Sequence, residues 1–158
     1  MKQTTTKQLI SWGVIGLIAA LAFHYVWETL GQALPGLPWP AILGMIVLSI
    51  VLLLLGRPIK KWNEGDRTRE IDHVAAARTA MLAKAASLAG SLLSGWYLGA
   101  AAYLFISAGG VRASAALGML LAVAASAILM VVGLIVESDC RLPPDDTAGT
   151  DPSGADLA

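Results

Sequence analysis

The sequence has 158 residues, of which 56% are hydrophobic and 14% charged, and its formal net charge is zero. An average soluble domain has about a quarter of its residues charged, so this chain is unusually poor in charge. Zero net charge and the lack of a basic face argue against nucleic acid as a partner. Cys140 is the single cysteine, which excludes an internal disulfide and gives no basis for a metal cluster, so no cofactor is expected.

Four long runs without Asp, Glu, Lys or Arg divide the chain. They hold 20 residues after Lys7, 28 after Glu28, 27 after Lys84 and 24 after Arg112. A helix needs about 20 mostly apolar residues to cross a bilayer. The sequence therefore predicts an all-α polytopic membrane protein, a bundle of four transmembrane helices within residues 1–136. The expected spans are residues 9–30, 39–55, 82–107 and 113–136.

The first span has two interpretations. Lys2 and Lys7 precede an apolar stretch, and Ala20-Leu21-Ala22 resembles a signal-peptidase site, so a cleaved signal peptide is one alternative. Apolar and aromatic residues continue beyond that site as far as Trp27, and aromatic residues favour the membrane interface. This continuation favours a retained membrane anchor.

Two hydrophilic segments lie outside the spans. The second span is expected to end at Gly56 and Pro58, because proline disrupts a helix interior. Residues 57–72 then form a loop with five basic residues, and helical character resumes near Asp72. The tail, residues 137–158, has six acidic residues, one arginine and no large apolar cluster, so we expect it to be disordered.

The distribution of Lys and Arg predicts the orientation. Basic residues gather before the first span and in the loop 57–72, whereas the opposite side has only Arg112. Lys and Arg near membrane spans are enriched on the cytoplasmic side. We therefore expect a multi-pass protein with both termini and the loop in the cytoplasm.

Small residues at four-residue spacing mark the third and fourth spans. Such residues let membrane helices approach closely, so the two series predict that these helices pack face to face. The third span carries Ala83, Ser87, Ser91, Gly95 and Gly99, and the fourth carries Ser114, Gly118, Ala122 and Ser126. The third and fourth helices are thus expected to form the tight core, with the second more exposed to lipid.

A few polar residues could carry chemistry. His24 and Glu28 are four residues apart and share one helix face, where they could relay protons or form a structural contact with Arg112. Arg78 and Lys84 could extend to the cytoplasmic interface or contact an anionic lipid or ligand. Two residues are too few for a metal site, and no nucleotide loop or nucleophile motif occurs.

The third span also carries a family resemblance. Arg78-Thr79-Ala80 and Gly95-Trp96-Tyr97-Leu98-Gly99, with Cys140-Arg141-Leu142-Pro143-Pro144 after the last span, resemble an actinobacterial family of small four-span membrane proteins of unknown function. Genes of this family often lie beside folate-biosynthesis genes. The resemblance implies the inner membrane as the location, and it implies no catalytic residues.

The sequence does not identify a reaction. The favoured function is a non-enzymatic accessory or scaffold subunit that binds other membrane proteins or copies of itself within the lipid bilayer. The alternative is a small oligomeric transporter or channel component for an anionic metabolite. Four spans are few for a complete carrier, which would have to oligomerise to enclose a path.

Overall fold

The computed structural model describes residues 4–31, 39–63, 73–107 and 113–140. These residues form four helices, α1 (Thr6–Thr29), α2 (Trp39–Asn63), α3 (His73–Ser107) and α4 (Ala113–Asp139). No residue of the described ranges lies in a strand. Each helix is long and apolar enough to cross a membrane, which marks the chain as a multi-pass membrane protein. The predicted all-α fold with four membrane-spanning helices is confirmed.

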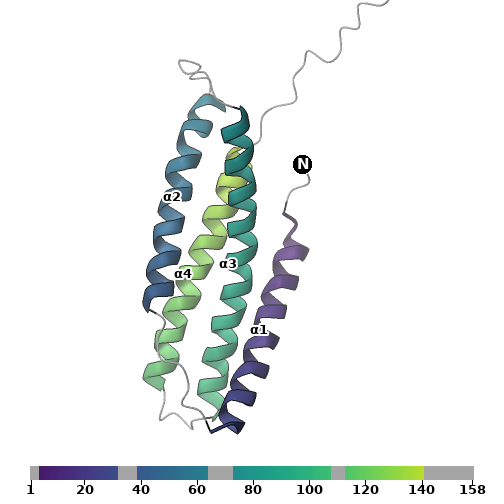
Figure 1. Cartoon of the computed structure of the whole chain (residues 1–158), viewed down its shortest axis with the longest axis vertical. Helices are drawn as coiled ribbons and strands as arrows, with labels where there is room; N and C mark the ends of the chain where they lie inside the picture. Colours follow the sequence, from purple (N-terminus) through teal and green to yellow (C-terminus); the bar gives the residue numbers. More distant parts are fainter. Residues whose placement is uncertain (1–3, 32–38, 64–72, 108–112, 141–158) are drawn as a thin grey trace, which may run out of the picture.

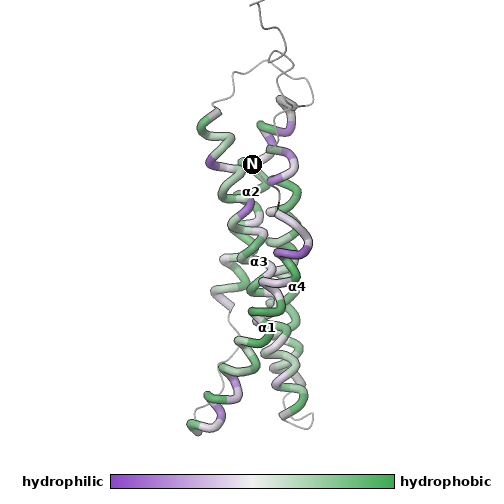
Figure 2. Tube along the Cα trace, turned by 90° about the vertical axis from the view of Figure 1, so that its right-hand side faces the viewer, coloured by the Kyte–Doolittle hydropathy of each residue, from purple (hydrophilic) through white to green (hydrophobic). Residues whose placement is uncertain are grey.

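The helices stand in a row, in the order α2, α4, α3, α1 (Figure 1). α3 packs against both α1 and α4, whereas α2 packs mainly on α4 and touches α3 at fewer positions. Among the described residues, α1 makes its helix–helix contacts with α3 alone. Hydrophobic residues cover much of the length of the helices (Figure 2). The arrangement therefore leaves α1 and α2 as the outer helices and α3 and α4 as the inner pair.

α1 has well-defined ends. The Thr5 hydroxyl accepts a hydrogen bond from the Gln8 amide while the Gln8 side chain accepts one from the Thr5 amide, which is a capping box. The helix stops before Gly31, whose φ of 67° favours glycine. The 24 residues between these ends give a length of about 36 Å, slightly more than a bilayer core of about 30 Å. α1 is continuous through Ala20-Leu21-Ala22.

α2 extends beyond the predicted end. Gly56 and Pro58 lie inside the helix, which continues to Asn63, so the prediction that they terminate it is wrong. Leu52, Gly56 and Ile59 are buried at spacings of four and three residues, on the stripe that faces α4. Pro58 removes one intrahelical hydrogen bond. Ile59, which follows Pro58, is buried again, so the packed stripe of α2 continues past the proline.

Residues 57–63 of the predicted loop therefore belong to α2, and residues 64–72 lie outside the described part of the chain. The first residues of the predicted tail are also helical. Residues 137–139 form the last turn of α4, and residues 141–158 lie outside the described ranges.

The most extensive helix–helix contact is between α3 and α4, the pair that the sequence predicts to pack face to face. A Cβ atom added at Gly90 would lie 2.6 Å from the Met130 amide nitrogen, and one added at Gly133 would lie 2.7 Å from the Ser87 nitrogen. Ala122 and Ser126 of α4 are completely buried. Gly118 is half-buried, and the side chain of Ser114 lies outside the part that the structure describes.

The small-residue series on α3 does not face α4 along its whole length. Ala83 and Ser87 contact Gly133 of α4, but Gly95 and Gly99 face α1. Four residues advance a helix by about 400°, so each member is rotated by about 40° from the one before it. From Ala83 to Gly99 the rotation adds up to about 160°. One series thus serves two neighbours on nearly opposite sides of α3.

Candidate functional site

The α1–α3 interface brings the backbones of the two helices together. A Cβ atom at Gly95 would overlap the Gly13 carbonyl oxygen and lie 2.7 Å from the carbonyl carbon. A Cβ at Gly16 would overlap the Leu92 carbonyl oxygen in the same way. The Ser91 hydroxyl donates a hydrogen bond of 2.5 Å to the carbonyl oxygen of Leu9. Close approach and an interhelical hydrogen bond are the means by which helices associate in lipid.

His24 lies in this interface with 3% of its surface exposed. Its Nδ1 atom is 2.8 Å from the carbonyl oxygen of Ala20, one turn earlier in α1. A carbonyl oxygen can only accept, so Nδ1 carries the hydrogen of this bond. The ring centroid lies 5.8 Å from that of Tyr103 and 6.3 Å from that of Trp96, both on α3.

Glu28 is exposed one turn further along α1, and its Oε2 atom accepts a hydrogen bond from the Tyr103 hydroxyl. His24 and Glu28 therefore share one helix face, as their spacing predicts, and both meet Tyr103. The proposed alternative partner of Glu28, Arg112, lies outside the described residues. We call His24, Glu28 and Tyr103 the polar joint.

The polar joint can hold α1 to α3 through the hydrogen bond between Tyr103 and Glu28. Within the described ranges, no group of three or more His, Cys, Asp or Glu side chains is placed to hold a metal ion. Sequence reasoning did not identify Tyr103. Its position could have been inferred from its depth in the membrane. Glu28 lies next to Thr29, the last residue of α1, and Tyr103 lies one turn before Ser107, the last residue of the parallel helix α3.

Arg78 and Lys84 both lie in the first half of α3, at the end of the molecule where α1 begins. Arg78 is exposed and Lys84 is half-buried. Six residues correspond to about 600° of helix rotation, so the two side chains leave α3 about 120° apart. The structure therefore does not join them into one cationic site.

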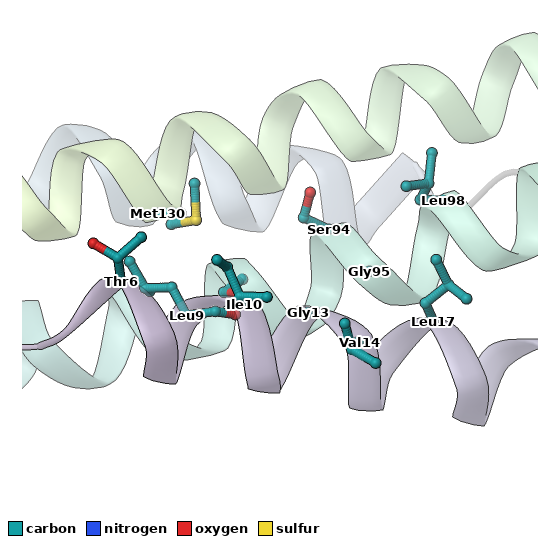
Figure 3. A pocket seen from close by; sticks show the side chains of 11 residues that line it. Thr6, Leu9, Ile10, Gly13, Val14, Leu17, Ser94, Gly95, Leu98 and Met130 are labelled. Carbon is teal, nitrogen blue, oxygen red and sulfur yellow. Dashed lines mark hydrogen bonds between the residues drawn. The ribbon is translucent and has the colours of Figure 1, made fainter.

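A groove lies between α1 and α4, with α3 as its floor (Figure 3). Its volume is about 420 Å³ and it is open along one side. Its lining comes from all three helices and is mostly apolar: Thr6, Leu9, Ile10, Gly13, Val14, Leu17, Ser91, Ser94, Gly95, Leu98 and Met130. No sequence pattern indicates this groove, because it depends on which helices are neighbours.

Two hydrogen bonds join the start of the chain to the end of α4 near this groove. The Thr4 amide nitrogen is 2.9 Å from Glu137 Oε1, and the Thr4 hydroxyl oxygen is 2.6 Å from Glu137 Oε2. We call this pair the N-terminal clasp. It spans residues 133 positions apart and connects α1 to α4, which make no direct helix–helix contact.

Cys140 follows α4 and packs half-buried against the core. Burial raises the pKa of its thiol, and the neighbouring Asp139 carboxylate raises that pKa further. A raised pKa leaves little reactive thiolate at neutral pH. The remainder of the Cys-Arg-x-Pro-Pro segment, residues 141–144, lies outside the described residues.

The comparisons with known proteins give one match. The family described as a protein of unknown function (DUF3180) matches residues 9–144, which cover all four helices and Cys140. No curated protein and no solved structure matches the chain. Because the match extends over most of the 158 residues, the chain belongs to the DUF3180 family.

Proposed function

We propose that this protein is a non-enzymatic accessory or scaffold subunit that binds other membrane proteins within the bilayer. The observation that carries the proposal is the way the buried polar side chains are used. Six polar side chains are buried in the described part of the chain, and each forms a hydrogen bond with a backbone carbonyl oxygen. The pairs are His24 with Ala20, Ser49 with Met45, Thr79 with Ala75, Ser87 with Lys84, Ser91 with Leu9 and Ser126 with Val123.

A solute pathway needs polar groups that are directed into a shared cavity, where they can replace the water lost by the solute. Here five of the six side chains bond within their own helix, and Ser91 joins α3 to α1. These polar groups serve the helices themselves. Their use favours a structural role over transport.

The row of helices also supports a binding role. α1 and α2 each present a broad apolar face that no other helix of the chain covers, with Ile18 59% and Val47 58% exposed. A partner helix could pack on either face, since helix association in lipid depends on shape and not on hydrophobicity. An outer helix at each end of the row gives the protein two separate docking faces.

The alternative, an oligomeric transporter component for an anionic metabolite, has one observation in its favour. Arg78 and Lys84 supply positive charge on α3 at the end of the molecule where α1 begins. Several copies could place such charges around a common entrance. A single row encloses no path, so this function would require an assembly.

Location and source belong to the same proposal. We infer that the protein resides in the cell inner membrane of an actinobacterium, with both termini in the cytoplasm and α1 retained. Retention is supported by the fit between Gly16 of α1 and Leu92 of α3, which a cleaved α1 would leave unused. The intact mass of the mature protein and the accessibility of terminal tags in whole cells would test these points.

Photo-crosslinking in living cells tests the accessory role. A photoreactive residue would replace Ile18 on α1 or Val47 on α2, with the completely buried Leu52 as the matched control. We expect a discrete protein adduct from one of the outer positions and none from Leu52. Two results together would favour the transporter alternative over the accessory function. The outer positions would crosslink only to lipid in cells, and the purified protein would move a defined anion across the membrane of liposomes.

A further inference from the structure

The two outer helices are shifted relative to each other along the long axis of the bundle. Leu9 of α1 is hydrogen-bonded to Ser91 of α3, 82 positions further along the chain, and Leu17 lies against Gly99 at the same separation. The parallel helix α3 therefore extends about 22 Å beyond the start of α1. In Figure 1, α1 begins lower than the upper ends of α2 and α3.

α2 lies at a different level on the other side of the row. A Cβ at Gly56 would lie 3.1 Å from the side chain of Val136 of α4. A Cβ at Gly133, one turn earlier in α4, would lie 2.8 Å from the carbonyl oxygen of Ala83 of α3. Because α3 and α4 run in opposite directions, Gly56 is approximately level with Ala83, that is, at the same height along the bundle axis.

These contacts bring the middle of one apolar stretch level with the start of the other. Val47 is the middle residue of the apolar stretch 39–55 of α2 and lies about 14 Å along the helix from the contact with Val136. It is therefore approximately level with Leu9, where the apolar stretch 9–30 of α1 begins. The centres of the two stretches differ in height by about 15 Å.

A bundle that stood upright, with its long axis perpendicular to the membrane, could not bury both apolar stretches. Their levels overlap only between Leu9 and Leu17, over about 12 Å. Val26 of α1 is 53% exposed and Leu54 of α2 is 54% exposed, and the two lie about 36 Å apart along the axis. A bilayer core is about 30 Å thick, so one of these side chains would lie outside it.

Interface residues mark the same two centres. Trp12 and Trp27 lie at equal distances from the middle of the apolar stretch of α1, and tryptophan favours both membrane interfaces. On α2, the exposed Trp39 and Arg57 lie at the two ends of its apolar stretch. Both helices thus have anchors that fit a bilayer, but the two bilayer centres lie at different levels of the bundle.

We propose that the row of helices sits obliquely in the membrane, tilted by about 30°, so that the bilayer contacts α1 and α2 at different levels. Packed helices are about 8 to 10 Å apart, so the outer helices of the row are separated by about 25 Å. An offset of about 15 Å over that width corresponds to about 30°, within the range of about 0 to 40° for membrane helices. The membrane-contact surface is an oblique belt with Ile18 and Val47 near its middle. This placement is independent of whether the protein acts as an accessory subunit.

The depth of nitroxide labels in the bilayer tests the tilt. Two pairs of outer residues are level along the bundle axis, Ile18 with Trp39 and Ile10 with Val47, and all four are between 58% and 61% exposed. Each would be replaced by cysteine in a Cys140→Ala chain, labelled, and reconstituted in liposomes of phosphatidylglycerol and phosphatidylcholine. Relaxation by oxygen and by a water-soluble nickel complex gives the depth of each label.

The two members of each pair should differ in depth. We expect labels at Ile18 and Val47 near the bilayer centre, and labels at Trp39 and Ile10 about 10 Å closer to a membrane surface. An upright bundle would give equal depths within each pair, wherever the bilayer centre lies. Equal depths in both pairs would therefore overturn the proposal.

Polarised infrared spectroscopy of the unlabelled chain in aligned bilayers gives a second test that needs no substitution. The dichroism of the amide I band reports the mean helix tilt, which we expect to be about 30°. A mean tilt below about 15° would overturn the proposal. Unequal label depths together with upright helices would show that the bilayer deforms around the row while the row itself stays upright.

Discussion

Replacement of Gly95 by alanine is the most direct test of the α1–α3 packing. The added Cβ would lie 2.7 Å from the carbonyl carbon of Gly13 and overlap the carbonyl oxygen. Carbon atoms in contact need about 3.5 to 4.0 Å, so α1 must withdraw from α3 by about 1 Å. Both contacting groups are backbone, so no side chain can rotate to make room.

The size of the effect follows from two opposing contributions. Overfilling a packed interface costs about 1 to 3 kcal/mol, and a rigid backbone clash places Gly95→Ala at the upper end, about 3 kcal/mol. Alanine in place of glycine gains up to about 1 kcal/mol from helix propensity. The net loss in the free energy of unfolding should therefore be about 2 kcal/mol.

Two matched controls isolate the cause. A Cβ at Gly44 of α2 meets no atom within 4 Å, so Gly44→Ala should keep or slightly raise stability. A Cβ at Gly13 would lie 3.4 Å from the Ser91 hydroxyl oxygen, an ordinary contact, so Gly13→Ala should be tolerated in the same interface. Unfolding by sodium dodecyl sulfate in mixed micelles gives the three free energies. Equal values for Gly95→Ala and Gly44→Ala would refute the close approach of α1 and α3.

Three further predictions concern the polar contacts and Cys140. Tyr103→Phe removes the donor to Glu28 and should lower the free energy of unfolding by about 1 kcal/mol in the same assay; no loss would mean that the polar joint adds nothing to stability. Cys140 should react slowly with maleimides at pH 7 and faster as pH rises toward its raised pKa, because the thiolate is the reactive form. Asp139→Asn should speed the reaction at neutral pH by lowering that pKa, and an unchanged rate would contradict the electrostatic contribution. Glu137→Ala removes both acceptors of the N-terminal clasp and should increase amide hydrogen exchange in the first turn of α1, with α2 exchange as the internal control.

The sequence was sufficient to predict the number of helices and the closeness of α3 to α4. Long runs without charge identify membrane spans because a charged side chain is costly in lipid. Small residues such as Ser87 and Ser126 at four-residue spacing indicate close packing, because they let the backbones of membrane helices approach each other.

The same sequence could not reveal the order of the helices in the row. In α2 the buried Leu52 and the exposed Leu54 are chemically identical, because lipid and protein interior are both apolar. Hydrophobic periodicity therefore carries no information on which face meets α4. The position of Gly95 against α1 was missed for a related reason: a four-residue series turns around the helix, and its spacing does not name the neighbour.

The close approach of α1 to α3 also explains the groove. Where Gly13 meets Gly95, the two backbones touch, so the larger α1 side chains on either side of the contact must extend past α3. On one side they stop short of α4, and the space between them and Met130 is the groove. A variant that pushes α1 away from α3 should therefore widen the groove and loosen α1 together. Gly95→Ala should therefore loosen α1 as well as lower stability, whereas Gly44→Ala should do neither, which ties the two properties to one contact.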